Sequence, residues 1–209
     1  MSPRNTQFSR DDIVAAAFQL VREEGWNGFS VQAVAKLINS STMPIYSQFA
    51  NVRDLEDAVC LKALDLLKER MLTDLTGDRW IDQGIIYVRF AEEEKFLFRA
   101  LWDARNVDLS KEMGKRFNEF IAATLADYLL FVGLDELEVR MIRLTRMMFA
   151  QKLAYWLNVN SNYLKEKGIP ELEEYMRRAS MAIYHGFRLQ FSAESVSATH
   201  FCGKGGKNE

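Results

Sequence analysis

The chain has few of the residues that build disulfide frameworks or metal centres, and it has no long hydrophobic run. Its 209 residues include 2 cysteines, 2 histidines and 3 prolines, and the net charge at pH 7 is −2. Two cysteines without Cys-x-x-Cys spacing give no disulfide framework, and the isolated histidines predict no metal site. Apolar runs such as residues 128–132 fall far short of the roughly 18 residues that a membrane span requires. A net charge near zero also excludes a polycation that coats nucleic acid.

Signals for cofactors and catalysis are equally scarce. We find no glycine-rich phosphate loop, no nucleophile–base pair and no metal-ligand spacing, so we expect no cofactor and no enzymatic activity. The carboxylate run Glu92–Glu94 is interpreted as a solvated helix end rather than a metal cluster. The start of the chain, Met1–Gln7, has no apolar segment of the secretory type, from which we expect a soluble cytoplasmic protein.

Helical periodicity runs through almost the whole sequence, without any strand pattern, and predicts an all-α fold. The clearest case is residues 30–38, where four apolar side chains recur at i, i+3, i+4 and i+7 and Ser30 is placed to cap the helix. Asn39 tolerates the left-handed conformation in which helices often end, and Ser40, Ser41 and Thr42 offer a cap for a second helix. Two short helices joined by a tight polar turn are therefore predicted for residues 30–49.

The second of these helices has an unusual outward face. Pro44 falls in its first turn, where the missing N–H costs little, and only Ile45 and Phe49 share an inward face. This leaves four side chains that point away from the core: Thr42, Met43, Ser47 and Gln48. A helix set into the DNA major groove has this pattern, although such a pair of helices is also common in proteins that do not bind DNA.

A preceding helix completes a three-helix unit. Its apolar residues recur with helical spacing from Ile13 to Val21, and Ser9–Asp12 matches a capping box. Gly25 can take the positive φ of a C-terminal cap. A long fourth helix is predicted to begin near Val52.

Three segments carry a resemblance to a known family: residues 13–35, residues 45–49 and the pair Asp54-Leu55. Together they resemble the DNA-binding domain of TetR-type transcriptional regulators. The resemblance implies an N-terminal helix-turn-helix domain over residues 1–52 and a helical bundle domain over residues 53–192 that binds an effector and dimerises. It further implies a homodimeric repressor that a small molecule releases from a palindromic operator.

The resemblance also implies which side chains contact the operator. Thr42, Met43, Pro44, Ser47 and Gln48 would face the bases, and the Tyr46 hydroxyl would reach a phosphate. Alternatively, the Tyr46 ring packs half-buried on Ile13 or Leu20. Val52 stands where the family usually has a phosphate-binding lysine, and Arg53 would substitute for it unless it pairs with Glu56 or Asp57. Ser30 and Lys36 complete the predicted contact set.

The predicted DNA-binding region is electrically neutral, because five basic side chains balance five acidic ones in residues 1–55. We therefore expect few cationic phosphate contacts and a shallow dependence of DNA affinity on salt.

The remainder of the chain predicts further helices over residues 54–75, 79–91, 96–104 and 110–131. Two more follow at about 135–157 and 171–191, with Leu137, Met141, Leu144, Met148 and Tyr155 close to a heptad seam. From the resemblance we expect homodimerisation through these last two helices, although the same stripes could face the core of the protomer. The tail, residues 193–209, is rich in Ser, Gly and Lys and is expected to be disordered.

Aromatic and methionine side chains concentrate between residues 80 and 156, where most belong to a core and a few could line an effector pocket. Our candidates for the ligand are Tyr87, Arg89, Trp102, Phe120, Met147 and Tyr155, and we expect a hydrophobic or aromatic effector. Two alternatives stay open: a helical adaptor that has lost DNA binding, and an all-α enzyme that uses the C-terminal pocket.

Overall fold

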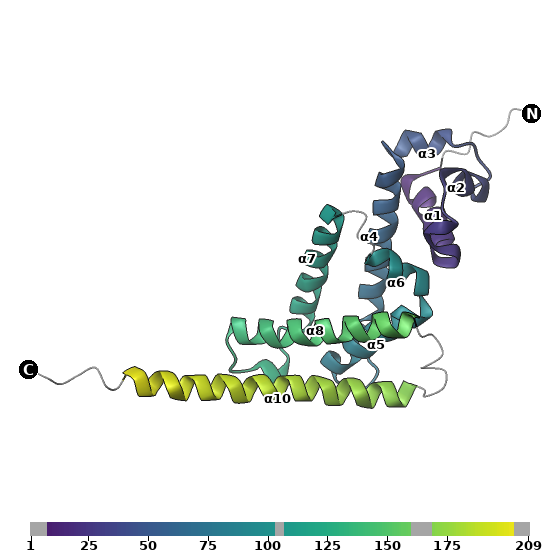
Figure 1. Cartoon of the computed structure of the whole chain (residues 1–209). Coiled ribbons are helices and arrows are strands. Elements are labelled where there is room, and N and C mark those ends of the chain that lie inside the picture. Colours follow the sequence, from purple (N-terminus) through teal and green to yellow (C-terminus); the bar gives the residue numbers. More distant parts are fainter. Residues whose placement is uncertain (1–7, 103–106, 160–168, 203–209) are drawn as a thin grey trace, which may run out of the picture. The chain divides into compact units, whose positions relative to one another are not determined.

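The computed structural model describes residues 8–102, 107–159 and 169–202, and every regular element within these ranges is a helix (Figure 1). The all-α prediction is confirmed. The chain forms two compact units: unit 1 comprises Met1–Thr73 and Arg89–Thr124, and unit 2 comprises Asp74–Val88 and Leu125–Glu209. The division differs from the boundary expected at residue 52, because the helix that follows residue 52 packs against the first helix of the chain.

Unit 1 is built around two helices, α1 (Arg10–Glu24) and α4 (Val52–Arg70), which contact each other and both contact α6 (Lys95–Leu101). Its core consists of apolar side chains with at most 2% exposure, among them Ile13, Ala17, Val21, Val34, Ile45, Leu55, Val59, Ala63 and Leu97. The other elements of unit 1 are the 3-10 helix η1 (Gly25–Asn27), α2 (Val31–Leu37), α3 (Met43–Gln48), the end of α5 (Arg79–Glu93) and α7 (Val107–Thr124).

Helix α1 begins and ends where the sequence predicts. The Ser9 hydroxyl accepts a hydrogen bond from Asp12 N (3.1 Å), and the Asp12 carboxylate accepts one from Ser9 N (2.9 Å), which closes the capping box. At the other end Gly25 has φ 69°, and a Cβ there would lie 2.8 Å from Cδ1 of Phe96. Glycine is therefore required at this position by backbone conformation and by packing.

Two helices are shorter than predicted, and a polar group outside the helix explains each case. Helix α4 ends at Arg70 instead of residue 75, because the buried Asp82 carboxylate accepts hydrogen bonds from the amides of Leu75 (3.1 Å) and Thr76 (3.0 Å). Helix α7 ends at Thr124 instead of residue 131, because the Tyr128 hydroxyl binds Asp78 (2.9 Å) and draws the chain into a separate 3-10 turn.

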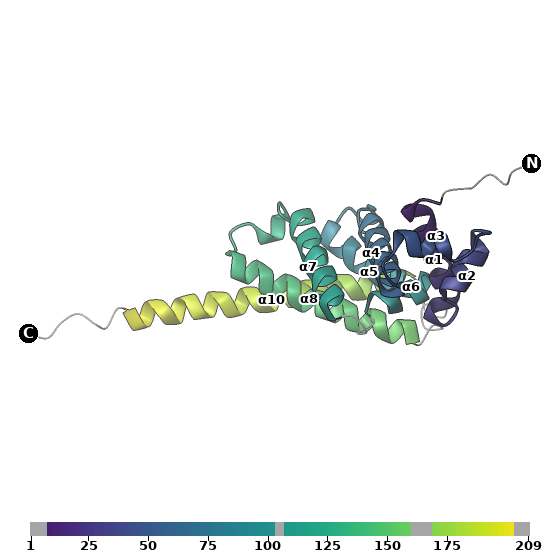
Figure 2. The same cartoon turned by 90° about the horizontal axis from the view of Figure 1, so that it is seen from above.

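Unit 2 contains the first part of α5, the 3-10 helix η2 (Leu129–Phe131), α8 (Glu136–Val159) and α10 (Ile169–Cys202). Helices α8 and α10 lie side by side and antiparallel (Figures 1 and 2). The fully buried Trp80 of α5 stacks edge-on against Tyr128 and Phe131. Helix α10 continues to Cys202, so it covers residues 193–202 of the segment expected to be disordered, whereas residues 203–209 lie outside the described residues.

Within the described ranges, no helix is both long enough and apolar enough to cross a membrane. The same residues hold no group of three or more His, Cys, Asp or Glu side chains suited to a metal ion.

Candidate nucleic-acid interface

The turn between α2 and α3 has the conformation that the sequence predicts. Ser30 caps α2, since its hydroxyl accepts a hydrogen bond from Ala33 N at 3.0 Å. Asn39 adopts the left-handed conformation with φ 51°, and Ser40 N donates to Ala35 O at 2.9 Å, which closes the helix end. These bonds satisfy backbone groups that would otherwise be left open at the end of α2, so α3 leaves the turn in a fixed direction.

Helix α3 turns two apolar side chains inward and most of its others outward. Ile45 and Phe49 are 2% and 3% exposed, and they hold the helix against α1. Met43 is 77% exposed and Tyr46 is 53% exposed, while Ser47 and Gln48 are also exposed. The exposure of Tyr46 disfavours the alternative of a ring that packs half-buried on α1. This face of α3 is accessible to a macromolecule.

The local hydrogen bonds refine two of the predicted roles. Thr42 occupies the N-cap of α3 without a side-chain capping bond, so its hydroxyl is not used as the predicted cap. The Ser47 hydroxyl donates to Pro44 O at 2.7 Å. In this conformation Ser47 offers lone pairs and not a proton to a ligand.

The cations near α3 are few. Lys36 and Arg53 are exposed, and Arg53 lies in the first turn of α4, whose N-cap is Asn51. The Arg10 guanidinium lies 4.6 Å from the centre of the Phe49 ring, a cation–π contact that ties α1 to the end of α3. Arg10 therefore also has a structural role at the base of the helix-turn-helix.

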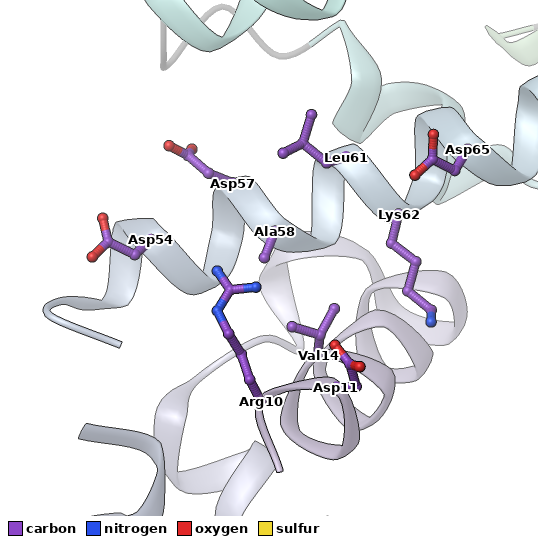
Figure 3. A pocket seen from close by; sticks show the side chains of 9 residues that line it. All are labelled: Arg10, Asp11, Val14, Asp54, Asp57, Ala58, Leu61, Lys62 and Asp65. Carbon is purple, nitrogen blue, oxygen red and sulfur yellow. The ribbon is translucent and has the colours of Figure 1, made fainter. Parts of the chain in front are cut away.

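An open groove of about 450 Å³ lies between α1 and α4 (Figure 3), with four carboxylates and two cations among its side chains. Its lining consists of Arg10, Asp11, Val14, Asp54, Asp57, Ala58, Leu61, Lys62 and Asp65. None of the six predicted ligand residues lines this groove. The excess of carboxylates makes it an unfavourable surface for phosphate.

The six predicted ligand residues are divided between the two units. Tyr87, Met147 and Tyr155 belong to unit 2, and Arg89, Trp102 and Phe120 belong to unit 1. Tyr87 is buried, whereas Tyr155 is 57% exposed and lies beside Lys152. Which of these residues contacts a ligand stays a prediction.

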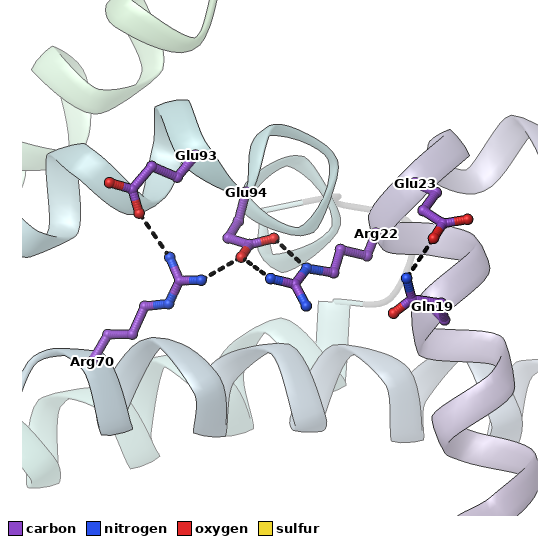
Figure 4. Close-up of polar contacts among 6 residues, drawn as sticks. All are labelled: Gln19, Arg22, Glu23, Arg70, Glu93 and Glu94. Atoms are coloured by element: carbon purple, nitrogen blue, oxygen red, sulfur yellow. Dashed lines mark hydrogen bonds and ion pairs between the residues drawn. The ribbon is translucent and has the colours of Figure 1, made fainter.

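Sequence reasoning missed a buried ion cluster in unit 1 (Figure 4). Glu94 is 5% exposed, and its carboxylate accepts hydrogen bonds from Arg22 of α1 at 2.5 and 2.7 Å and from Arg70 at the end of α4. Arg70 also donates to Glu93 at 3.0 Å. The interpretation of Glu92–Glu94 as a solvated helix end is thus wrong for Glu94. The bonds to Glu94 raise the pKa of Arg22 further above its ordinary value.

Arg146 of α8 is the second residue that sequence reasoning missed. It is 4% exposed and lies in the buried stripe that Ile142, Ala150 and Ala154 form along α8. The four-residue spacing of this stripe in the sequence could have predicted that Arg146 is buried.

Solved structures share this fold, and three of them illustrate the likeness. A TetR-family transcriptional regulator from Streptomyces coelicolor matches with a TM-score of 0.65 and 18% identity, covering 84% of this chain and 82% of that one. A transcriptional regulator from Rhodococcus sp. Rha1 matches with a TM-score of 0.64 and 18% identity, covering 86% and 97%. A TetR variant from Acinetobacter baumannii AYE in complex with minocycline matches with a TM-score of 0.56 and 14% identity, covering 88% and 98%.

The fold is that of TetR-family transcriptional regulators. No family model and no curated protein matches the sequence. The TetR fold accounts for the arrangement of α1, α2 and α3 as a helix-turn-helix followed by the long helix α4.

Proposed function

We propose that the chain is a DNA-binding transcriptional regulator, a homodimeric repressor that a small hydrophobic or aromatic effector releases from a palindromic operator. The observation that carries this proposal is α3, a short helix anchored by Ile45 and Phe49 with Met43, Tyr46 and Gln48 exposed. A recognition helix presents side chains to base edges in this way. The regulators among the structural neighbours support the same function.

The contacts divide into two kinds. Gln48 is suited to a base edge, since its amide can donate and accept together. The Tyr46 hydroxyl is suited to a phosphate, which fixes the position of the protein and carries no sequence information. Thr42, Pro44 and Ser47 complete the predicted base-facing set, and Ser30, Lys36 and Arg53 complete the phosphate contacts.

Dimerisation is supported by exposed apolar side chains on α8. The seam predicted from the sequence is solvent-exposed in a single chain: Leu137, Met141, Leu144, Met148 and Tyr155 are between 37% and 64% exposed. A row of large apolar side chains on one helix is typical of an interface. Helix α10 contributes less, because its Leu172 and Met176 are buried within unit 2. In the proposed dimer, two copies of α3 enter successive major grooves about 34–36 Å apart.

Release requires the effector to bind better to a conformation that does not fit the operator. A coupling free energy of about 1–3 kcal/mol would change the operator affinity about 5- to 150-fold. One structural neighbour was solved with minocycline bound, which supports a small-molecule effector for a protein of this fold.

Selection of bound sequences from a random DNA pool tests the proposal. We expect a palindromic consensus for the full chain. Gln48→Ala should relax the preference at one base pair in each half-site and leave the other positions unchanged. The matched control is Gln19→Ala, an exposed glutamine of α1 outside the predicted DNA contacts and the predicted dimer helices, which should retain the full consensus.

Failure of the selection would be informative. A pool without enrichment would refute DNA recognition and favour the helical adaptor, and a product formed from a small molecule would favour the all-α enzyme. A consensus without two-fold symmetry would retain the regulator but refute the dimer.

A further inference from the structure

Arg146 lies at the contact between α5, α8 and α10 of unit 2. Its guanidinium carbon is 5.6 Å from the centre of the Trp80 ring of α5. A Cβ built on Gly84 would lie 2.6 Å from Nη1 of Arg146 and 2.5 Å from the terminal methyl carbon of Met176 of α10. The Arg146 guanidinium therefore packs against the backbone of α5 at Gly84, where a larger residue would clash with it.

Among the described residues, this buried cation contacts the Trp80 ring but has no ion-pair partner. Among the described residues no carboxylate forms an ion pair with Arg146 and no atom accepts a hydrogen bond from its Nε. Asp78 and Tyr128 interact with the Arg146 guanidinium electrostatically, without a hydrogen bond to it. The Asp78 carboxylate already accepts hydrogen bonds from the Tyr128 hydroxyl and from two backbone amides. Burial lowers the pKa of Arg146 to about 10, so the group keeps its charge at neutral pH.

Two further polar groups on α8 and α10 have atoms without a hydrogen-bond partner among the described residues. Ser180 lies one turn after Met176 on α10, is fully buried, and its hydroxyl has no hydrogen-bond partner among the described residues. Arg143, on the preceding turn of α8, is half-buried, and its Nε has no acceptor within the described part of the chain. An uncompensated buried charge is costly, and a ligand that pairs with it would offset that cost.

We infer that unit 2 binds a small molecule with a single carboxylate, held by Arg146, and with an apolar or aromatic body against Trp80 and Met176. Asp78 offsets part of the positive charge of Arg146, which favours a monoanion over a phosphate dianion. Met176 is flexible enough to move aside for the ligand. The inference rests on the proposed function, because it names the class of the effector.

Ligand titration without DNA tests this inference. The probes are 3-phenylpropanoate and octanoate, each with its neutral amide, and phenyl phosphate as a dianion. We expect both carboxylates to bind in calorimetry and to raise the melting temperature, while the amides and the phosphate bind more weakly. Arg146→Met should weaken carboxylate binding about 10- to 100-fold, the loss expected for a charge-assisted bidentate bond.

Two further variants keep the result interpretable. Arg146→Lys retains the charge without the planar fork, so it should bind with intermediate affinity. Arg140→Met removes an exposed arginine of the same helix and should leave binding unchanged. The inference is overturned if neither carboxylate binds, if an amide or the phosphate binds as tightly, or if Arg146→Met binds as well as the parent chain.

Its failure is distinguishable from failure of the proposed function. Carboxylates that bind through Arg146 but leave operator affinity unchanged would support this inference and refute the release model. A neutral compound that releases the operator equally from the parent chain and from Arg146→Met would support the release model and refute this inference.

Discussion

Removal of the two arginines that hold Glu94 should destabilise the protein by more than the sum of the single changes. Glu94 is buried, whereas the side chains of Arg22 and Arg70 are 40% and 29% exposed. With one arginine left, the carboxylate keeps a charged partner. When both are absent, a buried carboxylate has lost the partners that Figure 4 shows.

The expected losses of stability differ because a single variant leaves Glu94 one charged partner and the double variant leaves it neither arginine. Arg22→Met and Arg70→Met should each lower the free energy of unfolding by about 0.5–1 kcal/mol, because solvent screens partly exposed arginines. The double variant should lose about 3–5 kcal/mol, the cost of an uncompensated buried charge. The difference is a coupling energy of about 1 kcal/mol or more, which a double-mutant cycle measures.

Urea unfolding followed by far-ultraviolet circular dichroism at pH 7 gives the four free energies of the cycle. Glu94→Gln in the double-variant background should recover part of the loss, because it removes the buried charge. Arg177→Met, which breaks an exposed ion pair on α10, serves as the control and should leave the unfolding midpoint unchanged. Costs that add to within about 0.5 kcal/mol, or a Glu94→Gln change without recovery, would refute the reasoning.

Four further predictions follow from the structure. Arg146→Met should raise the free energy of unfolding by about 1 kcal/mol or more, since an apolar side chain replaces an unpaired buried charge; a lower value in urea unfolding would assign Arg146 a structural role. Leu144→Glu on the exposed seam of α8 should give monomers in light scattering, and an unchanged dimer would exclude this seam. Tyr46→Phe should weaken binding to all DNA sequences alike, measured by fluorescence anisotropy on operator and random duplexes. The slope of log K against log salt should be roughly −4 to −5 for a dimer, at about −0.9 per neutralised phosphate, and a slope near −10 would contradict it.

The helix-turn-helix could be predicted from the sequence because its signals are local. The capping box at Ser9–Asp12, the stop at Gly25 and the left-handed Asn39 each act within a few residues, and all three are present in the structure. The inward face of α3 followed from spacing alone, as Ile45 and Phe49 are buried.

Features that depend on distant partners could not be predicted in this way. Glu94 accepts hydrogen bonds from Arg22 and Arg70, which are 72 and 24 residues away in the sequence. No pattern in the residues around position 94 indicates these partners. The end of α7 depends on a bond between Tyr128 and Asp78 that spans 50 residues. The ligand candidates were chosen by residue type, and residue type does not indicate to which of the two units a side chain belongs.

The acidic groove between α1 and α4 has a consequence for how a regulator of this kind would find its operator. Four carboxylates in that groove and a neutral first segment of 55 residues give the protein little attraction for arbitrary DNA. Most copies would then diffuse freely instead of sliding along the chromosome, and each encounter would be brief. Recognition would proceed by repeated three-dimensional collisions, so the copy number in the cell would set how fast a vacated operator is reoccupied.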